Sequence, residues 1–143
     1  INPSAETGDL AHAIKDADVF VGVSKPGLVT EEMVKSMGDK AIIFALSNPI
    51  PEIMPDIALA AGAAVVATGR SDFPNQVNNV LAFPGIFKGA LEGRLKTITR
   101  EMLVAAAEAL SKMVPEPTAE EIMPSPFAPG VAEVVSSAVK RVA

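Results

Sequence analysis

Short apolar runs alternate with polar, helix-forming segments through the first half of the chain. The apolar runs occupy residues 19–23, 41–46 and 63–67, and turn residues bound each of them. Their length and their β-branched and aromatic content are typical of strands that are buried on both faces of a parallel sheet. Helical spacing fills the intervals at 30–38 and 55–61. The pattern therefore predicts strand, helix, strand, helix, strand.

Capping residues and helix breakers give the predicted ends of these helices. Thr30 precedes two glutamates, which suits a hydroxyl cap beside the positive end of a helix dipole. Gly38 lacks a Cβ and is predicted to end that helix in the left-handed conformation. Pro55 is tolerated at a first helical position, and Gly62 closes the helix that it starts. A shorter helix precedes the first strand, with these residues at helical spacing: Leu10, Ala13, Ile14 and Ala17.

Strand–helix–strand units at this spacing require right-handed crossovers and a parallel sheet. We therefore predict an α/β fold, half of a doubly wound (Rossmann-like) parallel sheet flanked by helices. The half-sheet and an amide-rich loop are expected over 1–98, and closing helices over 99–143. Thr99 begins the first closing helix, and Thr118–Glu121 resembles a capping box. Pro84-Gly85 is expected to interrupt any helix begun near Asn78. The last helix, 131–142, is expected to turn these residues inward: Val134, Val135, Ala138 and Val139.

Composition excludes several classes of protein. The 143 residues are 49% hydrophobic and 20% charged, which is a globular composition. The net charge of −5 argues against binding to a nucleic acid backbone, and no stretch has the character of a membrane span. Cysteine is absent, so the chain has no disulfide or thiolate ligand. We expect a cytoplasmic protein with no nucleic acid or membrane partner.

The loops that follow the three strands are the predicted site. In an open parallel sheet, ligands bind outside the carboxyl ends of the strands. Gly22-Val23-Ser24 follows the first strand, and Gly22 would permit close approach of a flat ligand. Ser47 and Asn48 follow the second strand, and Pro49 restricts the backbone of Asn48. Taken alone, Asn48 before a proline is equally well read as a turn residue.

An amide-rich stretch follows the third strand. It carries Asn75, Gln76, Asn78 and Asn79, and each amide offers both donors and an acceptor. We predict that this row holds a small polar ligand at the open end of the sheet, although a single Asn would more simply cap a helix. Three nearby residues have plainer interpretations: Arg70 and Asp72 as a surface ion pair, and Ser71 or Asp72 as a helix cap. His12 is expected to be solvated.

The chain lacks the groups that would carry catalysis. It has no Gly-x-Gly-x-x-Gly turn, no tyrosine and no acidic cluster with metal-ligand spacing. Amides orient and polarise a substrate, but they carry no proton through a cycle near neutral pH. We therefore expect no catalysis from this chain alone. It opens on Ile1 and not on Met, and we interpret it as a piece of a longer protein.

Two long motifs resemble the malic enzymes, most of all the short bacterial and archaeal kind. They are Phe-Ala-Leu-Ser-Asn-Pro-Ile-Pro-Glu at 44–52 and the segment 67–90, which includes Asn-Asn-Val-Leu-Ala-Phe-Pro-Gly. Residues 18–24 fit the same family, and the similarity runs essentially end to end. The resemblance implies a parent enzyme that oxidises malate with NAD or NADP and a divalent cation, Mg²⁺ or Mn²⁺. The oxaloacetate so formed would lose carbon dioxide to give pyruvate.

The resemblance also implies roles for individual residues. Gly22, Val23, Ser24 and Ser47 would lie along the cofactor, and Asn48 beside its nicotinamide. Asn48 would also contact malate, together with Asn78 and Asn79. The base, the acid and the ligands of the cation would belong to an N-terminal catalytic part outside this chain.

Three matters stay open at this point. The choice between NAD and NADP is usually made in the first half of the sheet, which this chain does not contain. We expect a homo-oligomer, and we expect the half-sheet to leave one strand edge exposed. The competing hypothesis is a non-catalytic binding or assembly module derived from a dehydrogenase domain.

Overall fold

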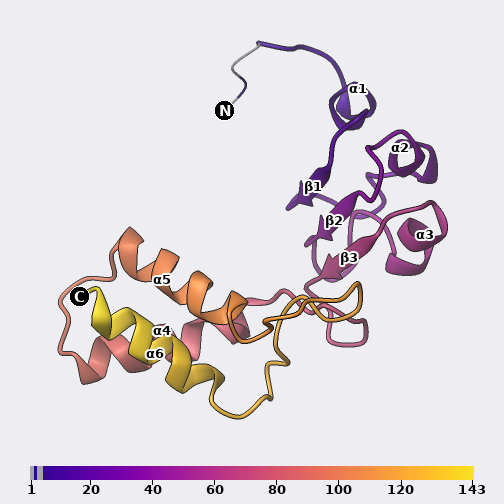
Figure 1. The fold of residues 1–143 in the computed structure, drawn as a ribbon. Coiled ribbons are helices and arrows are strands. Elements are labelled where there is room, and N and C mark those ends of the chain that lie inside the picture. Colours follow the sequence, from indigo (N-terminus) through magenta and orange to yellow (C-terminus); the bar gives the residue numbers. More distant parts are fainter. Residues whose placement is uncertain (1, 3–4) are drawn as a thin grey trace. The chain divides into compact units, whose positions relative to one another are not determined.

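The structure is a computed structural model that describes residue 2 and residues 5–143 (Figure 1). The chain forms two compact units, Ile1–Pro74 and Asn75–Ala143. The sequence placed the internal division near residue 98. The structure places it earlier because the helix at Phe83–Glu92 packs against the C-terminal helices. Each unit is described by itself.

The first unit is a parallel sheet with helices between its strands. In chain order the elements are α1 (Leu10–Ile14), β1 (Val19–Gly22), α2 (Glu31–Lys35), β2 (Ile42–Ala45), α3 (Pro55–Ala60) and β3 (Val65–Thr68). The strands pair in the order β1-β2-β3, all parallel. This confirms the predicted half of a Rossmann-like sheet, with β1 at one edge.

Helix ends in the first unit follow the predicted chemistry except at one position. The Thr30 side chain accepts a hydrogen bond from the Met33 backbone N–H at 3.3 Å, and so caps α2. Gly62 follows α3 with φ +109°, as expected of a closing glycine. Gly38 was wrongly predicted as a left-handed stop. The helix already ends at Lys35, and the Gly38 N–H donates to the Ala17 carbonyl at 3.0 Å.

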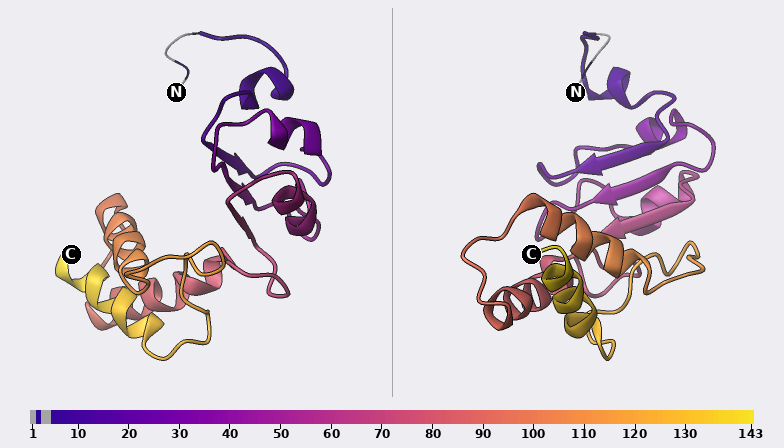
Figure 2. Two further views of the ribbon diagram at one scale, coloured as in Figure 1. Left: turned by 45° about the vertical axis from the view of Figure 1, so that its right-hand side comes forward. Right: turned by 60° about the vertical axis from the view of Figure 1, so that its left-hand side comes forward.

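The two faces of the sheet differ in burial. Helices α2 and α3 lie on one side of the strands (Figure 2), and that side holds the core, with Ile43 and Ala45 fully buried. On β1, the alternate side chains Val19 and Val21 are 50% and 62% exposed. The prediction of strands buried on both faces is therefore wrong for β1. Side chains alternate across a strand, and the face that carries Val19 and Val21 is uncovered at β1, whereas Ala67 on β3 is fully buried.

The second unit is a group of helices. It comprises the 3₁₀ turn η1 (Asn79–Leu81), α4 (Phe83–Glu92), α5 (Arg100–Ser111) and α6 (Val131–Arg141). Helix α6 packs against both α4 and α5. The core of the unit consists of Leu81, Ile86, Met102, Ala106, Leu110, Val131, Val135 and Val139. None of the helices in the described part of the chain combines the length and apolarity that a membrane span requires.

Three sequence expectations for this unit need correction. Pro84-Gly85 does not interrupt a helix but lies in the first turn of α4, where a proline costs no hydrogen bond. Val134 is 37% exposed, whereas the other three residues predicted to face inward are buried. Thr118–Glu121 closes on itself, because the Glu121 N–H donates to the Thr118 hydroxyl at 3.1 Å and no helix follows. The predicted cap of α5 is confirmed, with Thr99 accepting from the Met102 N–H.

Candidate functional site

The carboxyl ends of the three strands lie at one edge of the sheet. Gly22 is in register with Ala45, and Ala45 with Thr68, so the loops that follow these residues are neighbours. The Leu46 N–H donates to the Gly22 carbonyl at 3.0 Å, which continues the pairing past the strand end. The structure therefore brings Gly22–Ser24 together with Ser47 and Asn48, all within the first unit.

A buried glutamate joins the first two loops. Glu52 has no solvent exposure. Its Oε1 accepts a hydrogen bond from the Ser24 backbone N–H at 2.7 Å, and its Oε2 accepts from the Ser47 N–H at 3.0 Å. One carboxylate thus fixes the loop after β1 to the loop after β2. Sequence reasoning missed Glu52, because a glutamate in a proline-rich loop ordinarily lies on the surface.

Gly22 is required by Glu52. A Cβ at position 22 would lie 2.6 Å from Cδ of Glu52 and 2.8 Å from its Oε1, which is closer than such atoms approach. From the sequence, we explained Gly22 by the close approach of a flat ligand. The structure supplies a second reason, which is that the side chain of Glu52 occupies the space beside this glycine.

The loop after β2 presents Asn48 to solvent. Ser47 is buried, and its hydroxyl donates to the Ile50 carbonyl at 2.6 Å. Asn48 is exposed, and the Asn48–Pro49 peptide bond is cis. Val23 is 78% exposed at the end of β1. The apolar side chain of Val23 and the amide of Asn48 are thus both accessible at the same edge of the sheet.

Arg70 connects the loop after β3 to this loop. Its Nη1 donates to the Pro49 carbonyl at 3.3 Å, and its Nε and Nη2 bind the two oxygens of Asp72 at 2.8 and 2.6 Å. The hydrogen bond from Arg70 lowers the pKa of the Asp72 carboxyl, and the pKa of Arg70 is raised in return. The ion pair expected at Arg70 and Asp72 is confirmed. A capping role for Ser71 or Asp72 is wrong, since no helix begins there.

Asn75 has a structural role in the second unit. Its side chain is buried, with Nδ2 donating to the Ala119 carbonyl at 2.8 Å and Oδ1 accepting from the Ile122 N–H at 2.9 Å. The prediction that the Asn75 amide lines a ligand site is therefore corrected. The amide of Asn75 instead fixes the backbone of the loop at 118–122, which lies more than forty residues further along the chain.

Replacing Asn75 by alanine is expected to destabilise the protein by about 2–3 kcal/mol. The change removes the side-chain partners of the Ala119 carbonyl and the Ile122 N–H, two part-buried hydrogen bonds worth about 0.5–1.5 kcal/mol each. Asn75 also has φ +56°, where asparagine is better tolerated than alanine. Urea unfolding measures the loss. Asn75→Gly is the control, because it loses the same hydrogen bonds without backbone strain. A stable Asn75→Ala variant would contradict this role.

The paired amides at Asn78 and Asn79 lie at the start of the 3₁₀ turn. Oδ1 of Asn78 accepts from the Val80 N–H at 3.2 Å, and so caps η1. Asn79 is exposed, and Asn78 is half-buried. Both residues belong to the second unit and Asn48 to the first.

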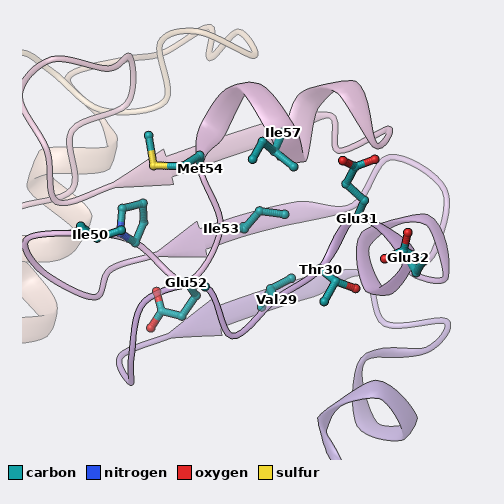
Figure 3. A pocket seen from close by; sticks show the side chains of 11 residues that line it. Val29, Thr30, Glu31, Glu32, Ile50, Glu52, Ile53, Met54 and Ile57 are labelled. Carbon is teal, nitrogen blue, oxygen red and sulfur yellow. The ribbon is translucent and has the colours of Figure 1, made fainter.

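A cavity of about 350 Å³ lies beside the start of α2 and α3 (Figure 3). Its walls are mainly apolar, with Val29, Ile50, Ile53 and Ile57 among them. The carboxylate of Glu52 turns toward the loop after β1, away from the side chain of Ile57 (Figure 3). None of the predicted site residues lines this cavity, although Glu52, which joins the two loops, belongs to its lining.

A parallel sheet with glycine, hydroxyl and amide groups at its carboxyl edge is typical of dinucleotide-binding domains. The chain belongs to the malic enzyme family: residues 2–143 match the family of the malic enzyme NAD-binding domain. The bifunctional malic/malolactic enzyme of Bacillus subtilis is 55% identical over 99% of this chain and 35% of that protein. The NAD-dependent malic enzyme of Geobacillus stearothermophilus is 50% identical over 99% of this chain and 30% of that protein.

A solved structure shows the same fold. The malic enzyme from Pyrococcus horikoshii superposes with a TM-score of 0.94 at 47% identity, over 99% of this chain and 33% of that one. The chain thus spans about a third of the length of these three relatives. The names of the relatives include both NAD-dependent and NADP-dependent malic enzymes. The resemblance seen in the sequence is confirmed.

Proposed function

We propose that this chain is the second half of the cofactor-binding domain of an enzyme that oxidises and decarboxylates malate to pyruvate and carbon dioxide. The observation that carries the proposal is the joining of the loops after β1 and β2 by Glu52 in a chain of this family. That joining places the exposed Val23 and Ser24 beside the loop that carries Asn48.

The groups at this edge fit a nicotinamide. Val23 offers an apolar surface for a flat ring, and the amide of Asn48 offers a donor and an acceptor for a carboxamide or a carboxylate. When bound, NAD or NADP would accept the hydride that leaves C2 of malate. Gly22–Ser24 and Ser47 would hold the cofactor, while Asn48 would orient malate against it. The malate contacts that the family resemblance implies for Asn78 and Asn79 stay predictions.

The work of this chain is positioning. Holding two reactants in the reactive geometry can lower a barrier by several kcal/mol. The base that takes the hydroxyl proton, the acid that protonates the enolate and the ligands of Mg²⁺ or Mn²⁺ would come from the part of the enzyme that precedes this region. The described residues contain no group of three His, Cys, Asp or Glu side chains that could hold a metal ion.

An assay of the full-length enzyme tests the proposal. Malate is expected to reduce NAD or NADP, with formation of pyruvate and carbon dioxide in equal amounts and only when Mg²⁺ or Mn²⁺ is added. Malate and cofactor should also raise the unfolding temperature, since a ligand stabilises the state that binds it. No cofactor reduction and no thermal shift would instead favour the non-catalytic assembly module.

A further inference from the structure

Within the described part of the chain, the partners of the buried Glu52 carboxylate are backbone N–H groups. Both of its oxygens accept hydrogen bonds from backbone N–H groups, which is the pattern of an ionised carboxylate. Across residue 2 and residues 5–143, no lysine, arginine or histidine forms an ion pair with it. The two backbone dipoles stabilise the charge, but they do not neutralise it.

This charge lies directly behind the candidate cofactor loops. Ser24 and Ser47, the two donors to Glu52, stand in the loops proposed to hold the cofactor. The side chain has no exposure to solvent, so bulk water screens its field less than it screens a surface charge. The oxidised nicotinamide ring is a cation, whereas the reduced ring is neutral. A fixed negative charge on this side of the loops therefore distinguishes the two redox forms.

We propose that Glu52 is an electrostatic positioning residue that favours oxidised NAD(P) over reduced NAD(P) at this site. The inference rests on the proposed function, because it needs the nicotinamide at the loops after β1 and β2. With this preference, the enzyme would bind the oxidised cofactor, which begins the reaction, more tightly. It would release the reduced cofactor, which is a product, more readily. If Glu52 were only a structural clamp, replacing it would weaken the binding of both redox forms to the same extent.

The test is the ratio of two dissociation constants, measured by calorimetry on the full-length enzyme. Glu52→Gln keeps the shape of the side chain and removes its charge. The dissociation constant of the reduced cofactor divided by that of the oxidised one is expected to fall about fivefold, as expected of one partly screened charge at close range. An unchanged ratio, with both forms weakened alike, would overturn the proposal.

Three control variants separate charge from loop geometry. Glu31→Gln makes the same substitution at an exposed residue of α2 and should leave the ratio unchanged. Ser47→Ala removes the hydroxyl bond to Ile50 without a change of charge, so it should alter both affinities and not their ratio. Glu52→Asp retains the charge and should retain the preference for the oxidised form. Loss of the preference in Glu52→Asp would count against the proposal.

A second measurement applies if Glu52→Gln fails to fold. The wild-type enzyme, loaded with ADP-ribose, is titrated with the cation 1-methylnicotinamide and with the neutral, similarly shaped 3-methylbenzamide. The cation is expected to bind about threefold more tightly or better, and equal affinity would overturn the inference. Failure of the proposed function has a different signature, because then neither redox form of the cofactor would bind to the wild-type enzyme.

Discussion

Replacing Asn48 by alanine in the full-length enzyme is expected to lower kcat/KM for malate about a hundredfold. The amide is exposed at the edge of the sheet, on a loop fixed by Glu52 and Arg70, so its removal costs positioning and not packing. Both turnover and malate affinity should fall. Steady-state kinetics measure the loss, and the unfolding temperature should stay within a degree or two of the wild type.

The matched control for this variant is Asn2→Ala, which removes another exposed amide from the same unit. Its kinetics should equal those of the wild type. Unchanged kinetics in Asn48→Ala would remove this residue from the site. Reduced activity together with a large drop in unfolding temperature would instead assign Asn48 a structural role.

Replacing Gly85 by alanine is expected to destabilise the second unit by about 2 kcal/mol or more. The new Cβ would lie 2.4 Å from Cβ of Val135 and 2.9 Å from the backbone oxygen of Ala132. Alanine gains roughly 1 kcal/mol in helix propensity over glycine, but this gain is too small to offset the separation of α4 from α6. Gly89 has a similar constraint, with a Cβ 2.8 Å from the Ser136 carbonyl.

Urea unfolding measures the effect of Gly85→Ala as a lower midpoint. Leu91→Ala is the control on the same helix, because its side chain is 78% exposed and contributes little to the core. That control should lie within about 0.5 kcal/mol of the wild type. A Gly85→Ala variant as stable as this control would mean that α4 and α6 do not pack as closely as described.

The sheet was predictable because its signals are local. Each apolar run of five or six residues between turn signals predicts a strand, and the helical spacing between runs leaves parallel pairing as the simple topology. Thr30 and Thr99 could be identified as caps for the same reason, since the partner of each cap lies three residues away. Whether these elements form, and where they end, is decided mainly by residues close to them in the sequence.

The prediction of burial failed where it depends on distant parts of the chain. Nothing in the run Val19–Val23 distinguishes a strand covered on both faces from one covered on a single face. Pro84 was misjudged because proline both breaks helices and begins them, and the difference lies in the preceding turn, η1. Val134 and Val135 are identical in type, and the positions of α4 and α5 decide which of them is buried.

The candidate site was predictable in part. Strand-end loops follow from topology, so Gly22–Ser24, Ser47 and Asn48 could be placed at one edge before any coordinates. Asn75 was assigned to the ligand because it carries the same kind of side chain as the neighbouring amides. Its actual partners, Ala119 and Ile122, lie more than forty residues away along the chain. Glu52 was missed for the opposite reason, since its partners are backbone N–H groups, which leave no trace in a sequence.

The two units would become complete at different times while the ribosome makes this chain. The first ends at Pro74, so its sheet can close once that residue has left the exit tunnel. The second cannot settle then, because Gly85 and Gly89 of α4 are matched to residues of α6 that are translated about fifty positions later. Until α6 emerges, the apolar faces of α4 and α5 that pack against it stay exposed to solvent. The nascent chain would most need a chaperone during this interval.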